Sequence, residues 1–307
     1  MVALSVLDLV PVSTTPSAAI AATIRAAQVA EEAGYQRYWI GEHHNTPGLA
    51  CGATTILMGH IASVTSTIRV GSGGTMVPLH RPLRLAEDLG TLATLHPKRI
   101  EAALSGGAGV DAETMRQLGR NTSVMADVRQ LHQHLASTAG MFCQVPLCIM
   151  GAGVQAATLA GQLGLPFAFT SHYAPRSLDA AIAAYHAGFM PSQQCTQPYV
   201  LASANVMVCD SRDEAEFQMT TLLQMFESAV TGKRGLLSPP RAIEMHPLVK
   251  AQIGESLQVT FAGTGPDVTL RMQRWASAHS IDEIITVTYA YDPEIREASI
   301  QELGNWF

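Results

Sequence analysis

Apolar runs rich in β-branched and aromatic residues alternate with helix-forming segments along the whole chain. Each run is continuously apolar, which is typical of a parallel strand buried on both faces. Eight such strands in 307 residues favour an α/β fold, a closed TIM (β/α)8 barrel, over an open sheet. The predicted strands lie within residues 3–12, 37–44, 68–77, 98–104, 145–151, 166–172, 198–210 and 283–291.

A glycine- and proline-rich excursion, residues 231–265, interrupts the alternation and is interpreted as an insertion before strand eight. No repeat, low-complexity tract or linker marks a domain boundary, so residues 1–307 are expected to form a single barrel domain. In TIM barrels the chemistry lies where strands end and helices begin. The polar and glycine-rich stretches at those points are therefore the candidate site.

Composition argues against several classes of protein. The formal net charge of −6 gives no basic footprint for nucleic acid. No apolar run reaches the roughly 18 to 20 residues of a membrane helix, and no targeting segment is visible at the start. The five cysteines form no CxxC pair, so neither a zinc knuckle nor a disulfide framework is indicated, and a cytoplasmic location is expected.

The stretch "WIGEHHN" places Glu42, His43 and His44 at the end of the second predicted strand. His80 and His172 follow the third and sixth strands and could join them around a metal ion. The stretch itself has no HxH or HxxxH spacing, so a metal site is the least favoured reading. A second interpretation, in which the histidine is only packed and hydrogen-bonded at the strand end, also stays open. Proton transfer by His43 is favoured, because an imidazole titrates near neutral pH.

Glycine-rich stretches end the third, fourth and fifth predicted strands. "VGSGGTMVP" could lay bare backbone against a flat ligand, or could be a bulge at the barrel rim. "SGGAGVD" and "MGAGV" are strand-to-helix turns that could present backbone N–H groups to an anion. No GxSxG elbow occurs, which disfavours a serine hydrolase.

Together these pieces resemble the bacterial luciferase-like monooxygenases over nearly the whole chain. The matching stretches include "LSVLDLVPV", "AEEAGYQRYWIGEHHNTPGLACG", "TSTIRVGSGGTMVPLHRPLRLAEDLG", "LAGQLGLPFAFTSHYAP" and "QPYVLASANVMVCDSRDEA". The resemblance implies a TIM barrel that binds reduced FMN, or less often the deazaflavin F420. Members that use FMN react it with dioxygen. The resemblance also implies a small-molecule substrate, a separate flavin reductase as partner and a homodimer.

The resemblance assigns roles to individual positions. His43 matches the catalytic base beside the flavin, and Gly73, Gly74 and Thr75 match the backbone that supports the isoalloxazine ring. Gly106, Gly151, Ala152 and Gly153 stand at the positions that hold the flavin phosphate. The residues expected on the substrate side are Asp8, Glu42, His44, His80, His172 and Tyr173.

The chain departs from the family's pattern at the phosphate positions. Gly106 replaces an arginine, and Ala152, Gly153, Gln155 and Ala156 stand where hydroxyl side chains are common. Loss of an arginine and two hydroxyls would weaken binding by roughly 3 to 6 kcal/mol. Backbone N–H groups could compensate, or a cation could reach the phosphate from elsewhere in the chain. The candidates for such a cation are Arg81, Arg84, Lys98 and Arg116.

Two functions therefore remain open. The leading one is a luciferase-like monooxygenase that uses reduced FMN and dioxygen to oxidise a small organic substrate. The alternative is a member of the family that binds no flavin and acts as a non-redox enzyme or as a binding or partner subunit. An F420-dependent oxidoreductase is less favoured, because F420 also carries a phosphate.

Overall fold

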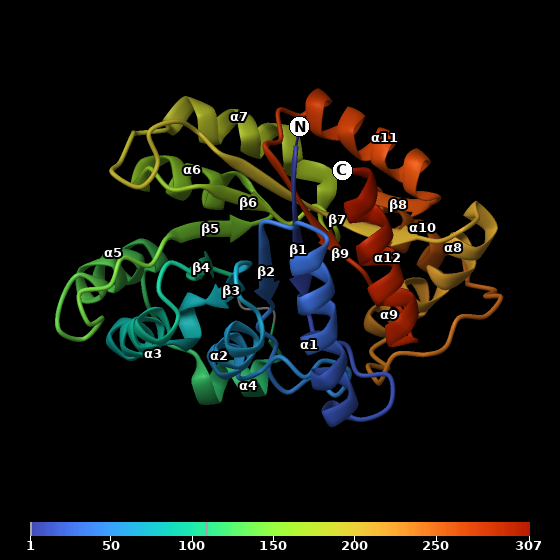
Figure 1. Ribbon diagram of the computed structural model, residues 1–307, viewed down its shortest axis with the longest axis horizontal. Coiled ribbons are helices and arrows are strands. Elements are labelled where there is room, and N and C mark those ends of the chain that lie inside the picture. The colour runs from blue at the N-terminus through green and yellow to red at the C-terminus, as the bar shows by residue number, and fades with distance from the viewer. Residues whose placement is uncertain (1, 108–109) are drawn as a thin grey trace.

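The computed structural model describes residues 2–107 and 110–307 and shows a parallel β-barrel surrounded by helices (Figure 1). Going round the barrel, the strands follow the order β1, β2, β3, β4, β5, β6, β7, β9, and β9 pairs with β1 to close it. The strands are β1 (Ala3–Asp8), β2 (Arg37–Ile40), β3 (Arg69–Met76), β4 (Ile100–Ser105), β5 (Leu147–Gly151), β6 (Phe167–Phe169), β7 (Val200–Val208), β8 (Thr260–Gly263) and β9 (Glu283–Val287). The predicted TIM barrel is confirmed.

Helices cover the outside of the barrel, and the first and last of them lie side by side (Figure 1). They are α1 (Pro16–Glu32), α2 (Thr54–Val64), α3 (Pro82–Leu95), α4 (Ala112–Leu118), α5 (Val124–Leu135), α6 (Val154–Leu163), α7 (Leu178–Gly188), α8 (Arg212–Gln218), α9 (Thr220–Val230), α10 (Pro247–Ser256), α11 (Gly265–Ala278) and α12 (Pro293–Trp306), with short 3₁₀ turns η1 (Val77–Leu79) and η2 (Pro175–Ser177).

Local sequence accounts for the limits of α1. The Thr15 hydroxyl accepts a hydrogen bond from the Ala18 N–H at 3.2 Å, and Pro16 occupies the first turn. The chain leaves the helix at Gly34, whose φ of +82° lies in the left-handed region. The buried face of α1 consists mostly of alanines, which let its backbone approach the strands closely.

The structure corrects the predicted end of the second strand. Strand β2 ends at Ile40, so Glu42, His43 and His44 lie in the loop after the strand rather than on it. The helix-forming stretch of residues 211–230 makes two helices, α8 and α9, which meet at Met219. Leaving the strand frees the three residues from strict in–out alternation, so neighbouring side chains can turn to the same side.

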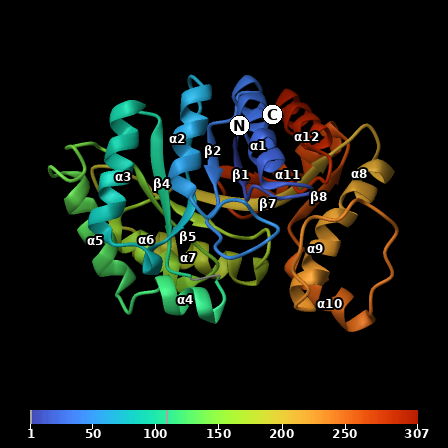
Figure 2. The same cartoon turned by 90° about the horizontal axis from the view of Figure 1, so that it is seen from below.

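The excursion at residues 231–265 lies before the last barrel strand, as expected, but it is not irregular throughout. It contains α10 and the short strand β8. Strand β8 pairs in parallel with the end of β7, where Asn205 stands opposite Thr260, and it takes no part in closing the barrel. Figure 2 shows α9 and α10 next to each other at one side of the barrel.

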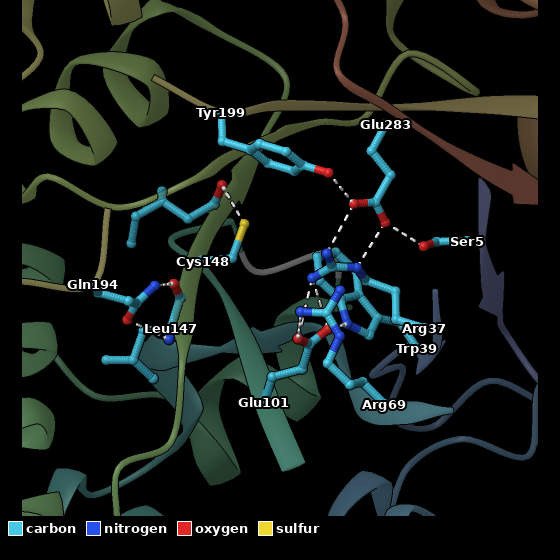
Figure 3. A network of polar contacts seen from close by, with 11 residues as sticks. Ser5, Arg37, Trp39, Arg69, Glu101, Leu147, Cys148, Gln194, Tyr199 and Glu283 are labelled. Atoms are coloured by element: carbon cyan, nitrogen blue, oxygen red, sulfur yellow. Dashed lines mark hydrogen bonds and ion pairs between the residues drawn. The ribbon is translucent and has the colours of Figure 1, made fainter. Parts of the chain in front are cut away.

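A buried ionic network fills the amino-terminal end of the barrel (Figure 3). The guanidinium of Arg37 on β2 donates to Glu283 on β9 at 2.6 Å and to Glu101 on β4 at 2.9 Å. Glu101 also accepts from the indole N–H of Trp39 at 2.5 Å, and Glu283 from the Tyr199 hydroxyl at 2.8 Å. Buried charges are tolerated when they are paired and fully hydrogen-bonded. This network joins strands at the end of the barrel where they begin.

Across the residues that the structure describes, no helix combines the length and apolarity needed to cross a membrane.

Candidate active site

A cavity of about 420 Å³ opens where the strands end, within the size range of small-molecule sites. The barrel contributes residues at or just beyond the ends of β1, β2, β3, β4, β5, β6 and β9. Most of the wall is apolar. Its barrel-derived lining includes Leu7, Leu9, Gly73, Gly74, Met76, Ser105, Met150, Gly151, Thr170, His172 and Tyr289.

Glu42 is a buried carboxylate that organises two histidines. Its Oε1 atom lies 2.7 Å from Nε2 of His44 and 2.7 Å from Nε2 of His80, and its Oε2 accepts the Met76 N–H at 2.8 Å. Burial raises the pKa of Glu42. The hydrogen bond and charge of His80, the hydrogen bond from His44 and that from the Met76 N–H together outweigh burial, so the pKa is lowered. Glu42 is therefore an ionised acceptor.

The other predicted residues of this group separate into those that line the cavity and those that do not. His43 and Glu42 line it, whereas His44 and His80 lie behind Glu42 and are absent from the wall. Both imidazoles use Nε2 on the same carboxylate oxygen, which makes a hydrogen-bonded cluster. Within residues 2–107 and 110–307, no three His, Cys, Asp or Glu side chains form a metal-binding group.

His43 is half-buried in the cavity wall and is poised as a base. Burial lowers the pKa of its imidazole, and the positive charges of Arg234 and His44 lower it further, against the raising effect of the Glu42 carboxylate. The ring is therefore neutral at neutral pH and can accept a proton from a molecule in the cavity.

His172 is a second neutral imidazole in the wall. Its Nδ1 lies 2.6 Å from the Ser203 hydroxyl, which itself donates to the Phe169 carbonyl at 3.2 Å. Because the hydroxyl has one proton, its oxygen accepts from Nδ1–H, and Nε2 of His172 is left as an acceptor. Burial lowers the pKa of His172 to about 3, and His43 adds to the shift. Thr170, also in the wall, has a buried hydroxyl with no hydrogen-bond partner in the described part of the chain.

The β3 glycines form an irregularity at the rim of the barrel and also border the cavity. The pairing of β3 with β4 shifts register between Gly73 and Thr75, and the Gly73–Gly74 peptide bond is cis. Gly73 and Gly74 also line the cavity with bare backbone. A Cβ at Gly73 would lie 2.9 Å from the Leu7 side chain and 3.0 Å from that of Trp39, so packing also leaves little room for a side chain there. Thr75 is buried beside them and donates to the Ser72 hydroxyl at 2.8 Å, outside the cavity wall.

The two turns that were expected to hold a phosphate each contribute residues to the cavity wall. Gly151 lines the cavity, and Gly153 precedes α6 without any side-chain cap, so the first N–H groups of that helix carry no capping side chain. In the other turn the Ser105 hydroxyl accepts the Gly107 N–H at 3.2 Å. Gly106, Ala152 and Gly153 are not in the cavity wall, and the middle of the "SGGAGVD" stretch, residues 108–109, lies outside the described residues.

Asp8 was expected on the substrate side, but it lies away from the cavity. Its carboxylate accepts from the hydroxyls of Thr23 at 2.6 Å and Tyr38 at 2.7 Å and pairs with Arg296 at 2.6 Å. Asp8 ends β1 and Arg296 lies on α12, so the pair fixes a helix to the barrel. Tyr173 does line the cavity, and its ring meets that of His172 edge to face at 4.9 Å.

Sequence reasoning missed one wall of the cavity. Residues from the second half of α9 and from the segment after it cover the cavity, and Arg234 is among them. Of the described residues, none of Arg81, Arg84, Lys98 and Arg116 reaches the wall. The only local signal is a basic pair beside a glycine in "TGKRGLLSPP", which does not reveal where the segment folds.

Comparisons with known proteins agree with this architecture. The family model for luciferase-like monooxygenase matches residues 2–278. A luciferase-like monooxygenase of Escherichia coli (strain K12) is 35% identical over 319 residues, covering 98% of this chain and 95% of the relative. The N-acetyl-S-alkylcysteine monooxygenase of Bacillus subtilis (strain 168) is 37% identical over 111 residues, 36% of this chain and 33% of the relative. The crystal structure of apo-MsnO8 superposes with a TM-score of 0.92 at 28% identity, covering 100% of this chain and 98% of that one. The chain belongs to the luciferase-like monooxygenase family.

Proposed function

We propose that the protein is a flavin-dependent monooxygenase that uses reduced FMN and dioxygen to oxidise a small organic substrate. The observation that carries the proposal is the meeting of a neutral His43 with the bare Gly73–Gly74 backbone in the wall of one apolar cavity. Membership of the family and the resemblance of these positions to its flavin site support it.

The residues of the cavity fit the ring of a flavin. Gly73 and Gly74 offer a face without side chains, and Met76 and Met150 add apolar surface. At the phosphate end, backbone N–H groups of the Gly151–Gly153 turn and the start of α6 stand where arginine and hydroxyl side chains are common in the family. The helix dipole favours an anion at that position.

When bound, reduced FMN would supply the electrons that let one oxygen atom of dioxygen enter the substrate while the other leaves as water. The protein's own part is to bind, exclude water and manage protons. His43 accepts a proton at an imidazole nitrogen that faces the cavity, and Glu42 holds His44 and His80 beside it. Nε2 of His172 is a second acceptor that orients a donor group of the substrate.

Flavin binding is the first test. The purified protein is titrated with FMN, oxidised and then reduced under anaerobic conditions. Binding of reduced FMN in the micromolar range is expected if backbone groups replace the lost phosphate ligands. Absence of binding at millimolar FMN would contradict the proposal and favour the flavin-free alternative, which Gly106, Ala152 and Gly153 motivate. Titration with F420 in parallel tests the less favoured deazaflavin.

His43→Ala tests the assignment of the base. Removal of a general base is expected to lower kcat by roughly 10²- to 10⁴-fold with little change in flavin affinity. Because the pKa of His43 is lowered from 6.5, the wild-type acid limb of the pH–rate profile is expected below pH 6.5. His60→Ala, at an exposed position on α2, is the matched control. Unchanged turnover in His43→Ala would exclude the role.

We also propose, from the resemblance, a separate flavin reductase as partner and a homodimer. Light scattering after size exclusion measures the oligomeric state. Turnover with chemically reduced FMN, in the absence of any reductase, tests whether the reductase only supplies the cofactor.

A further inference from the structure

The segment of residues 234–238, here called the strap, covers the cavity and is held at several points. The Leu237 N–H donates to the Val12 carbonyl at 2.8 Å, and the Val12 N–H donates to the Gly48 carbonyl at 2.8 Å. Gly48 packs so closely on the strap that an added Cβ would lie 2.2 Å from the Gly235 carbonyl oxygen. At its far end, the Ser238 carbonyl accepts from the Thr221 hydroxyl at 3.2 Å. The strap, and Arg234 with it, therefore has a defined position over the cavity.

Arg234 and Glu42 are the two fully charged side chains among the described lining residues. Glu42 is already satisfied by His44, His80 and the Met76 N–H. Arg234 is exposed, makes no hydrogen bond or ion pair to any residue within 2–107 and 110–307, and borders a mostly apolar space. A guanidinium beside an apolar cavity recognises a carboxylate or phosphate, which it can bind through two parallel N–H groups.

The position of Arg234 indicates which of these two anions it would bind. The strap is attached to segments that follow β1 and β2, through Val12 and Gly48. The turns that suit a flavin phosphate follow β4 and β5, two to four strands further round the barrel. The field of Arg234 also reaches His43, whose pKa it helps to lower. The guanidinium therefore lies on the same side of the cavity as the proposed base, His43.

We propose that Arg234 binds the carboxylate of the substrate, so that the enzyme acts on organic acids with an apolar body. The body occupies the apolar wall that includes Leu49, Met225, Phe226 and Leu236, and the carboxylate pairs with the guanidinium at the strap. The assignment rests on the proposed function, because it names the substrate class of the same cavity. It adds a binding residue from the excursion that is distinct from the base and from the flavin positions.

The test measures binding without flavin or turnover. Octanoate and its neutral counterpart octanamide are titrated by calorimetry at pH 7.5 into the wild type, Arg234→Gln and Lys233→Gln. Lys233 is the exposed neighbour that does not line the cavity, so its variant removes the same charge as a control. Arg234→Gln is expected to weaken octanoate binding by roughly 10- to 100-fold and leave octanamide unchanged, since a charge-assisted hydrogen bond is lost.

A second arm distinguishes the source of the anion. FMN and riboflavin, which differ in the phosphate, are titrated into the same variants by flavin fluorescence, and an unchanged FMN-to-riboflavin ratio is expected. Selective loss of FMN binding in Arg234→Gln would assign the guanidinium to the flavin phosphate and overturn the proposal. Equal weakening of octanoate and octanamide, or no octanoate binding by the wild type, would overturn it too. Because the first arm contains no flavin, failure of the monooxygenase proposal leaves its result standing.

Discussion

The histidine at position 172 is kept neutral by its surroundings at the mouth of the barrel. His172 is 6% exposed, and burial lowers its pKa from 6.5 to about 3. Below pH 6.5 the unfolded chain therefore takes up a proton that the folded chain does not, so stability is lost as the pH falls. The hydrogen bond to Ser203 fixes which nitrogen carries the remaining proton.

Replacement of His172 should remove this part of the pH dependence. Between pH 6.5 and about 3, the free energy of unfolding of the wild type should fall more steeply than that of His172→Gln, by roughly 1.4 kcal/mol per pH unit. Urea denaturation at several pH values measures the difference. Exposed His186→Gln serves as the control, and parallel curves for wild type and His172→Gln would show that His172 is protonated in the folded protein.

At the scale of elements, the strap depends on a glycine in a different loop. Gly48 follows β2, and its missing Cβ makes room for the backbone of Gly235. The Leu237 amide, bonded to Val12, reports whether the strap is seated. The strap and the loop around Gly48, which lie far apart in the chain, thus cover the cavity together.

Gly48→Ala should displace the strap from its position over the cavity. The added methyl group cannot be accommodated without a backbone shift, so a loss of roughly 1 to 3 kcal/mol of stability and faster hydrogen exchange at Leu237 are expected. Gly254→Ala on α10, where an added Cβ meets nothing within 4 Å, is the control. Exchange at Leu237 that stays at the wild-type rate would argue that the strap is not held by this contact.

For the whole molecule, the two ends of the barrel differ: a buried ionic network lies where the strands begin, and the cavity lies where they end. The Arg37 network closes the amino-terminal end with buried charges from three strands, as Figure 3 shows. The cavity and its histidines occupy the other end. Changes to the network should therefore alter stability and leave the chemistry of the cavity in place.

Arg37→Leu should be strongly destabilising, because it leaves Glu101 and Glu283 buried without their main cation. A loss of roughly 3 to 5 kcal/mol is expected from denaturation measurements. The control is Arg25→Gln, whose surface pair with Glu297 should contribute no more than about 1 kcal/mol. Equal losses in the two variants would mean that the network does not stabilise the barrel end.

The barrel and the position of its cavity could be predicted from local patterns. Continuous apolar runs between helix-forming segments specify buried parallel strands, and the "EHH" and "GSGG" stretches follow two of them. The excursion was located, but α10 and β8 within it were not predicted, because short elements in a Gly- and Pro-rich stretch have weak periodicity. The break between α8 and α9 was likewise hidden by a helical pattern that runs through Met219.

The amino-acid sequence by itself determined the number, order and direction of the barrel strands, because these depend on neighbours along the chain. Tertiary structure alone decided that Asp8 pairs with Arg296, that Glu42 turns two histidines away from the cavity, and that Arg234 borders it. Each of these outcomes depends on which distant segments meet when the barrel closes. A side chain's partners follow from that closure, and no local pattern of residues encodes them.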